Sequence, residues 1–375
     1  MGAPTAPDGD AGTTPPRGAP VDATQVDWSM GSAAARLADW ETALKLGRRV
    51  AGPGLSVPAV QRARMREDFG ELVPYAETLI TDHTGMAVDG FRSRAWVMAR
   101  REWIRANLTG MQRLLEPLAE RVLSEKPGRA EIRRKAMGAQ AGALFGYVAR
   151  RVLGQYDVFL PPDDEGLLYF VGPNVAEVEQ RFGLPQRDFR LWVAIHEVTH
   201  RVQFGAAPWL RGHLRGLVDS YLGGVSLDAK ELIQQMRRAV EEARGGTDAR
   251  MGGIFLLLTP EQRELFTKVQ GLMSLLEGHA SYVMNEVSRD HVADVDRMRR
   301  ALAVRRKGSG LERNVQKAIG FEQKVQQYDR GEAFVREAVS RAGMDGFNRV
   351  WLAPEHLPTL DEIGAPAAWV ERVAG

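Results

Sequence analysis

The sequence LWVAIHEVTHRVQF, residues 191–204, places two histidines four positions apart within an otherwise apolar run. On an α-helix, residues i and i+4 lie on the same face one turn apart, so His196 and His200 can both reach one small ion. Glu197 is rotated from His196 by about 100° around the helix axis. It therefore cannot easily be a third ligand, but it can contact a water molecule bound to the ion.

This spacing is the HExxH motif, in which two neutral imidazoles hold zinc and the glutamate takes a proton from the bound water. Three apolar neighbours, Ile195, Val198 and Val202, would keep such a site dry. The alternative is that chance placed three ionisable residues in this register. A buried helix face rarely accepts three such groups without a partner, and this favours a metal site.

The composition limits which other chemistry the chain can carry. Its 375 residues include no cysteine, which excludes disulfides, thiolate nucleophiles and cysteine-bound metals. Any metal must therefore be held by histidine nitrogens and carboxylate oxygens. Fifty basic against 48 acidic side chains leave a net charge of +2, so nothing in the charge favours nucleic acid or an anionic membrane as a partner.

The start of the chain has a different character from the rest. Residues 1–25 are rich in Gly, Ala, Pro and Thr with few large apolar side chains, which predicts a disordered tail. This segment lacks the charged start and apolar core of a signal peptide. No apolar run reaches the length that crosses a bilayer. We therefore expect a cytoplasmic protein.

Hydrophobic periodicity predicts a mainly α-helical fold with a small β-sheet. Short aromatic and β-branched runs predict two strands, YDVFLP at 156–161 and LLYFVG at 167–172. The chain then divides into a tail over 1–25, a helical N-terminal region over 26–155 and a metal-binding catalytic region over 156–375. Helices of the N-terminal region are predicted at 32–50 (with Ser32 as N-cap), 57–80, 91–108, 111–125 and 127–153.

A catalytic zinc needs a third protein ligand and an open position. The longer pattern HExxHxxGxxH is absent, because Gln203 and Ala206 stand where its glycine and third histidine would be. The stronger candidate is GLMSLLEGHASYVMNEV at 271–287, an apolar helix that carries Glu277 and His279. A carboxylate on such a face needs a cation. The two residues lie about 200° apart around a regular helix, so only one can face the ion.

The segment LLEGHASYVM resembles the NEGFASY-type segment of gluzincins, zinc peptidases whose third ligand is a glutamate on a helix beyond HExxH. The resemblance implies that Glu277 is the third ligand and leaves His279 to shape the pocket. The spacing departs from the pattern, because Glu277 follows His200 by 77 residues, far more than in typical gluzincin aminopeptidases. The intervening segment, including PWLRGHLRGLVDSYLGG, would then be an insertion.

Over roughly residues 26–372 the chain also resembles a bacterial family of zincin-like metallopeptidases or hydrolases, some members of which are associated with deazaflavin coenzyme biosynthesis. The resemblance implies a zincin-like fold with a helical N-terminal region. The segments that carry it are HEVTHRVQF, PWLRGHL, MSLLEGHASYVM, QYDRGEAFV and GMDGFNRVW.

Other residues are candidates for supporting roles. Tyr328 is the best candidate to hold the oxyanion of a tetrahedral intermediate, and the alternative is a tyrosine packed at a helix boundary. His213 is a candidate donor to a substrate carbonyl, or else a surface histidine. Ser281 stands where some gluzincins place an orienting aspartate, so the partner of the zinc-bound histidines is not identified. The strand at 167–172 is either an edge strand that pairs with an extended peptide or a plain core strand.

These observations predict a zinc-dependent hydrolase of gluzincin type that cleaves a peptide or a small amide bond, with Glu197 as the base that activates water. The first alternative is a catalytically silent zincin-fold binding or scaffold protein with a structural zinc. The second is an accessory enzyme that acts on a small cofactor precursor.

Overall fold

The computed structural model describes residues 33–88, 93–122, 130–158, 167–224, 258–307 and 321–375. Side chains at 121, 122, 130, 306, 307 and 321–329 lie outside this description, and so does the predicted tail over 1–25.

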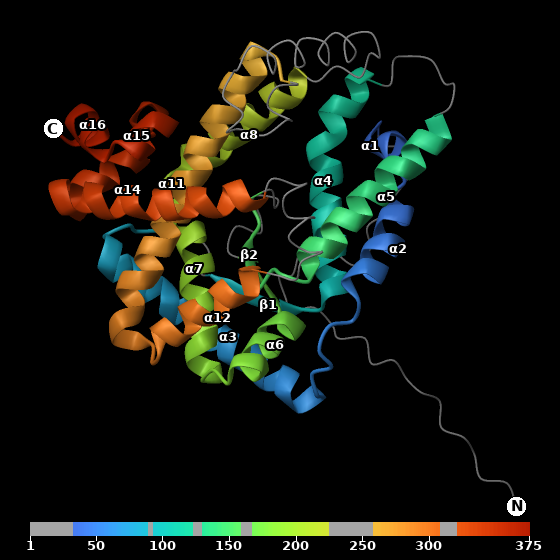
Figure 1. The fold of residues 1–375 in the computed structure, drawn as a ribbon, viewed down its shortest axis with the longest axis horizontal. Coiled ribbons are helices and arrows are strands. Elements are labelled where there is room, and N and C mark those ends of the chain that lie inside the picture. The colour runs from blue at the N-terminus through green and yellow to red at the C-terminus, as the bar shows by residue number, and fades with distance from the viewer. Residues whose placement is uncertain (1–32, 89–92, 123–129, 159–166, 225–257, 308–320) are drawn as a thin grey trace, which may run out of the picture.

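A three-stranded sheet lies at the centre of the fold (Figure 1). Its strands, in the order β1-β3-β2, are β1 (Arg94–Met98), β3 (Leu167–Val171) and β2 (Gly154–Tyr156). β1 runs parallel to β3, whereas β2 runs antiparallel to it. β3 is the central strand and is buried along its whole length, so the segment at 167–172 is a core strand. The edge-strand interpretation of that segment is wrong, and β2 is the edge beside the motif helix.

The two faces of β3 pack into different hydrophobic cores. Leu168 and Phe170 point into a core shared with the motif helix, where the ring of Phe170 stacks on that of Phe69 at 4.0 Å. Leu167, Tyr169 and Val171 point into the other core. A strand buried on both faces is expected to be a continuous apolar run, as LLYFV is.

Helices cover both faces of the sheet, as Figure 1 shows. The face with the motif helix is covered by α3 (Ala59–Thr84), α7 (Gln186–Ala206), α11 (Pro260–His291) and α14 (Phe321–Asn348). The other face is covered by α2 (Trp40–Ala51), α4 (Arg100–Val122) and α5 (Ala130–Ala149), with α1 (Ala33–Leu37) beside α4.

The remaining elements connect or close these layers. They are α6 (Gly172–Phe182), α8 (Pro208–Gly223), α12 (Val295–Lys307) and a C-terminal arm of short turns, η3 (Arg349–Trp351), η4 (Pro354–His356), α15 (Leu360–Gly364), α16 (Pro366–Trp369) and η5 (Val370–Ala374). The mainly α-helical fold with a small sheet is confirmed.

Several local predictions are wrong. The break predicted between residues 108 and 111 is absent, because α4 is one helix from Arg100 to Val122. Residues 94–98 form β1 rather than helix, because RAWVM pairs with β3 across a long separation in sequence. The single helix predicted over 32–50 is two helices, and the N-cap of the second is Asp39, whose carboxylate accepts from the Thr42 N–H at 2.9 Å. The strand predicted at 156–161 overlaps β2 only at Tyr156, since residues 157 and 158 are not strand and residues 159–166 lie outside the description.

Segments on both sides of residue 155 contribute to the sheet and to both hydrophobic cores. Arg100 donates to the Asn174 side chain at 2.6 Å and to the Ala51 carbonyl at 3.0 Å. Asn174 is fully buried and donates in turn to the Val152 carbonyl at 2.6 Å. These hydrogen bonds join the predicted N-terminal region to the predicted catalytic region.

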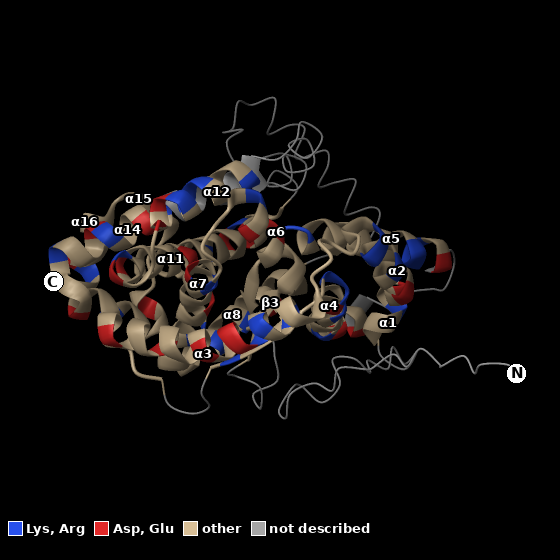
Figure 2. Cartoon of the chain, turned by 90° about the horizontal axis from the view of Figure 1, so that it is seen from below, with Lys and Arg blue, Asp and Glu red and all other residues tan. Residues whose placement is uncertain are grey.

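Basic and acidic residues are interspersed over the helices (Figure 2). Among the described helices, none combines the length and apolarity that crossing a membrane requires.

Candidate metal centre

The structure brings together the three side chains proposed as ligands. His196 and His200 project from one face of α7, with ring centroids 4.9 Å apart. Both Nε2 atoms point at the same carboxylate oxygen of Glu277 on α11, at 3.5 Å from His196 and 3.7 Å from His200. One ligand atom from each of the three residues lies within 4.8 Å of the other two.

Close helix packing holds Glu277 in place. α14 crosses α11 beside it, and a Cβ atom added to Gly278 would fall 2.2 Å from the carbonyl carbon of Gly331. Only glycine allows the two backbones to approach in this way. Since α11 also packs along α7, Glu277 is held over the two histidines.

Glu277 and His200 shift each other's pKa in the directions expected of an ion pair. Burial acts to raise the pKa of Glu277, but hydrogen bonds from His196 and His200 outweigh it and hold the pKa below its ordinary value. Burial also disfavours a charged His200, yet the nearby charge of Glu277 raises the pKa of His200 to about 9. The charged carboxylate therefore has a positive partner even without a metal.

Glu197 lies between α7 and the edge strand β2. Its side chain is 9% exposed, and its carboxylate accepts a hydrogen bond from the backbone N–H of Tyr156. A Cβ atom added to Gly154 would fall 2.5 Å from Glu197 Cγ, so the strand lies directly against the side chain. Burial raises the pKa of Glu197, against the opposing charges of His196 and His200. The carboxylate is thus held rigidly beside the three donor atoms.

Gln203, one turn after His200 on α7, supplies a partner that the sequence left unidentified. Its side-chain oxygen lies 3.0 Å from His200 Nδ1, and its side-chain nitrogen lies 2.9 Å from the Leu276 carbonyl and 3.0 Å from His279 Nδ1. Gln203 is fully buried. A polar residue in the buried face of a helix, one turn from a proposed ligand, was the signal that could have identified it.

The chain is similar to a known protein family and to a solved structure. The family model described as zincin-like metallopeptidase matches residues 38–370. The chain belongs to this zincin-like family. A solved structure from Chloroflexus aurantiacus, described as "a putative hydrolase with a novel fold", is similar, with 35% sequence identity and a TM-score of 0.66. The similarity covers 90% of this chain and 98% of that one. No curated protein matches the chain significantly.

The donor set of this zincin-like chain fits the zinc that the family name implies. Two ligands of a tetrahedral zinc, each about 2.0–2.1 Å from the ion, lie roughly 3.3–3.5 Å apart. The separations of 3.5 and 3.7 Å between the imidazole nitrogens and the Glu277 oxygen are close to this spacing. The side chains of His196, His200 and Glu277 remain 24, 14 and 20% exposed, which leaves a side open to water.

The two other histidines named from the sequence, His279 and His213, do not belong to this group of donor atoms. His279 is fully buried, points toward Gln203, and packs its ring against Phe347 and Trp351 at centroid distances of 5.3 and 5.2 Å. It therefore does not line an open pocket. His213, on α8, packs edge-on against Trp209 at 5.7 Å, and burial lowers its pKa.

The side chain of Tyr328 lies outside the described part of the molecule. Its backbone belongs to α14, three residues before the Gly331 crossing. Ser281 lies one turn beyond Glu277 on α11 and is partly buried.

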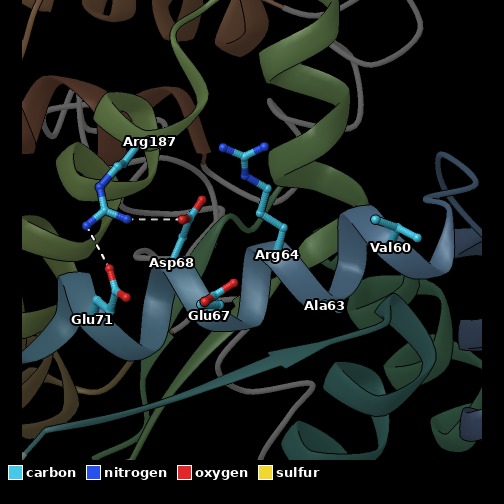
Figure 3. A pocket seen from close by; sticks show the side chains of 7 residues that line it. All are labelled: Val60, Ala63, Arg64, Glu67, Asp68, Glu71 and Arg187. Carbon is cyan, nitrogen blue, oxygen red and sulfur yellow. Dashed lines mark hydrogen bonds and ion pairs between the residues drawn. The ribbon is translucent and has the colours of Figure 1, made fainter.

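A separate hollow of about 560 Å³ lies beside α3 (Figure 3). Three of its charged residues form ion pairs, because Arg187 contacts Asp68 at 3.1 Å and Glu71 at 2.8 Å. Beneath them, the fully buried Arg190 pairs with Asp68 and Glu179. This network joins α3 to α7 and is a structural feature. The lining residues are Val60, Ala63, Arg64, Glu67, Asp68, Glu71 and Arg187.

Proposed function

We propose that this chain is a zinc-dependent hydrolase of gluzincin type that cleaves a peptide or small amide bond. The observation that carries the proposal is the position of Glu197, a buried carboxylate held by β2 beside three converging donor atoms. A purely structural metal site needs donor atoms but no base beside them. This favours a hydrolase over the scaffold alternative.

His196, His200 and Glu277 are the side chains that would hold the ion. Bound there, zinc would supply Lewis acidity toward a carbonyl oxygen and would acidify a water molecule. The two imidazoles bind in their neutral form, so His200 must lose the proton that its raised pKa retains beside Glu277 in the metal-free chain.

Glu197 acts as the general base and then as the general acid. It takes a proton from the attacking water and delivers it to the leaving nitrogen of the substrate. A base works best when its pKa lies near the working pH, and burial moves the pKa of Glu197 in that direction. The Tyr156 N–H orients the carboxylate while this happens. Peptides and small amides both present the same carbonyl and leaving nitrogen to this residue.

Tyr328 is our candidate donor to the oxyanion. Support comes from the crossing of α14 over α11 at Gly331 and Gly278. Gly278 directly follows Glu277, and Gly331 lies three residues after Tyr328. A donor at this place would stabilise charge that develops on the substrate oxygen.

A screen of the purified chain against pooled peptides and small amides tests the proposal. Products are identified by mass spectrometry as pairs of fragments whose masses add up to that of the substrate plus one water. We expect cleavage that stops with a zinc chelator and returns when zinc is restored. Zinc-loaded protein that cleaves nothing in such pools would instead favour the scaffold alternative, and cleavage that a chelator does not affect would contradict the zinc mechanism.

A further inference from the structure

A buried chain of hydrogen bonds links the two helices that carry the proposed ligands. It runs from His200 Nδ1 to the Gln203 oxygen at 3.0 Å, and from the Gln203 nitrogen to the Leu276 carbonyl at 2.9 Å and His279 Nδ1 at 3.0 Å. Gln203 and His279 are both fully buried. Leu276 immediately precedes Glu277 on α11.

The Leu276 carbonyl fixes the direction of each hydrogen bond that the Gln203 side chain makes. A carbonyl oxygen can only accept, so the amide nitrogen of Gln203 must face it. The amide oxygen of Gln203 therefore faces His200 and accepts a hydrogen from its Nδ1. A neutral His200 that carries its hydrogen on Nδ1 has its lone pair on Nε2, the atom that points at Glu277.

His279 completes the chain as an acceptor. The second N–H of Gln203 points at its Nδ1, so the hydrogen of the His279 ring is on Nε2. Packing against Phe347 and Trp351 fixes the ring plane.

We propose that Gln203 is a positioning residue that holds the hydrogen of His200 on Nδ1, presents Nε2 to the metal, and is itself oriented by His279. This inference rests on the proposed zinc site. It gives the buried His279 a role in metal affinity although it does not reach the metal. The same contacts set the distance between α7, with its two histidines, and α11, with Glu277.

Four variants separate hydrogen bonding from packing. Gln203→Met keeps the length of the side chain but removes both the acceptor and the donors. His279→Phe keeps the aromatic packing but removes the acceptor, whereas His279→Asn loses the packing and keeps an oxygen close to the position of Nδ1. Thr199→Val is the matched control, because Thr199 is buried on the same helix and its hydroxyl donates only to the Ile195 carbonyl, at 2.7 Å.

Zinc affinity, measured by competition with a chromophoric chelator, is the readout, together with the absorption spectrum of the cobalt-substituted proteins. Partners that orient a ligating histidine typically contribute about 10- to 100-fold in metal affinity. We expect a loss of that size in Gln203→Met and His279→Phe, with an altered cobalt spectrum. His279→Asn should bind zinc more tightly than His279→Phe even if it melts at a lower temperature. Thr199→Val should match wild type.

¹⁵N NMR of the metal-free chain, labelled at its histidines, shows which ring nitrogen of each histidine carries the hydrogen. This test does not depend on the zinc affinity of any variant. The His279 ring, assigned by the signal that is lost in His279→Asn, should carry its hydrogen on Nε2. A hydrogen on Nδ1 would overturn the inference.

The zinc affinities distinguish a failure of the proposed function from a failure of this inference. Wild type that binds no zinc would contradict the proposed function and this inference with it. Wild type that binds zinc, with Gln203→Met and His279→Phe equal to it, would overturn the inference alone. Affinities that follow melting temperature across all four variants would also overturn it, because packing would then explain them.

Discussion

The backbone of Gly154 lies directly against the carboxylate side chain of Glu197. A Cβ atom at this position would fall 2.5 Å from Glu197 Cγ and 2.9 Å from its Oε1. Such distances are shorter than any ordinary packing contact, so a larger residue in β2 must displace Glu197 or the strand. The edge strand and the proposed base are therefore coupled.

Gly154→Ala should reduce turnover in the hydrolysis assay by about tenfold to a hundredfold, because a shift of about 1 Å in a reacting group has effects of this size. Zinc content should stay at the wild-type level, since none of the three proposed ligands is touched. Gly70→Ala is the control: Gly70 is exposed on α3, and an added Cβ there meets nothing within 4 Å. Equal turnover in Gly154→Ala and Gly70→Ala would argue against a positioned Glu197.

Metal content should depend on Glu277. Glu277→Ala removes the oxygen on which both imidazoles converge, so purified protein should lose most of its zinc, measured by elemental analysis against wild type. His213→Ala should keep its zinc, because His213 packs on Trp209. The assignment of ligands is wrong if Glu277→Ala retains full occupancy while His213→Ala loses it.

The stability of the metal-free chain should fall between about pH 6.5 and 9. Despite burial, Glu277 raises the pKa of His200 to about 9 in the folded chain, whereas an unfolded histidine titrates near 6.5. A raised pKa stabilises the fold below the unfolded value, and this contribution is lost as the pH rises through the folded value. Melting temperatures of metal-free wild type and His200→Gln should therefore converge across this range. A constant gap between the two would show that the ion pair does not form.

Removing the metal should lower the melting temperature by a few degrees and leave the fold intact. Two hydrophobic cores, one on each face of the sheet, stabilise the described chain independently of the three proposed ligands. Circular dichroism with and without a chelator checks this. Complete loss of the helical signal would instead indicate a structural zinc.

Local patterns were enough to locate the histidines of the candidate site. The spacing of His196 and His200 is a property of one helix, and an acidic residue in the apolar run of α11 already indicated a cation partner at Glu277. Gln203 could not be assigned a role in the same way. The role proposed for it depends on the Leu276 carbonyl and on His279, which belong to a different helix.

The strand β1 likewise depends on residues far away in the sequence and could not be predicted locally. RAWVM is too short for its alternation to stand out between helical segments, and it is a strand because β3, 73 positions further along the chain, pairs with it. By contrast, LLYFV could be recognised locally, because burial on both faces leaves a continuous apolar run. Whether that run lay at an edge or in the centre depended on β1, which the sequence did not reveal.

The central claim is that Glu197 is the base of a hydrolase, and turnover by the zinc-loaded Glu197→Gln variant tests it most directly. Glutamine keeps the size and the hydrogen-bonding oxygen but cannot take a proton. We expect wild-type zinc content with turnover lower by about 10² to 10⁴, toward the upper end because the carboxylate moves the proton twice. A zinc-loaded Glu197→Gln protein that turns over substrate at the wild-type rate would contradict the claim.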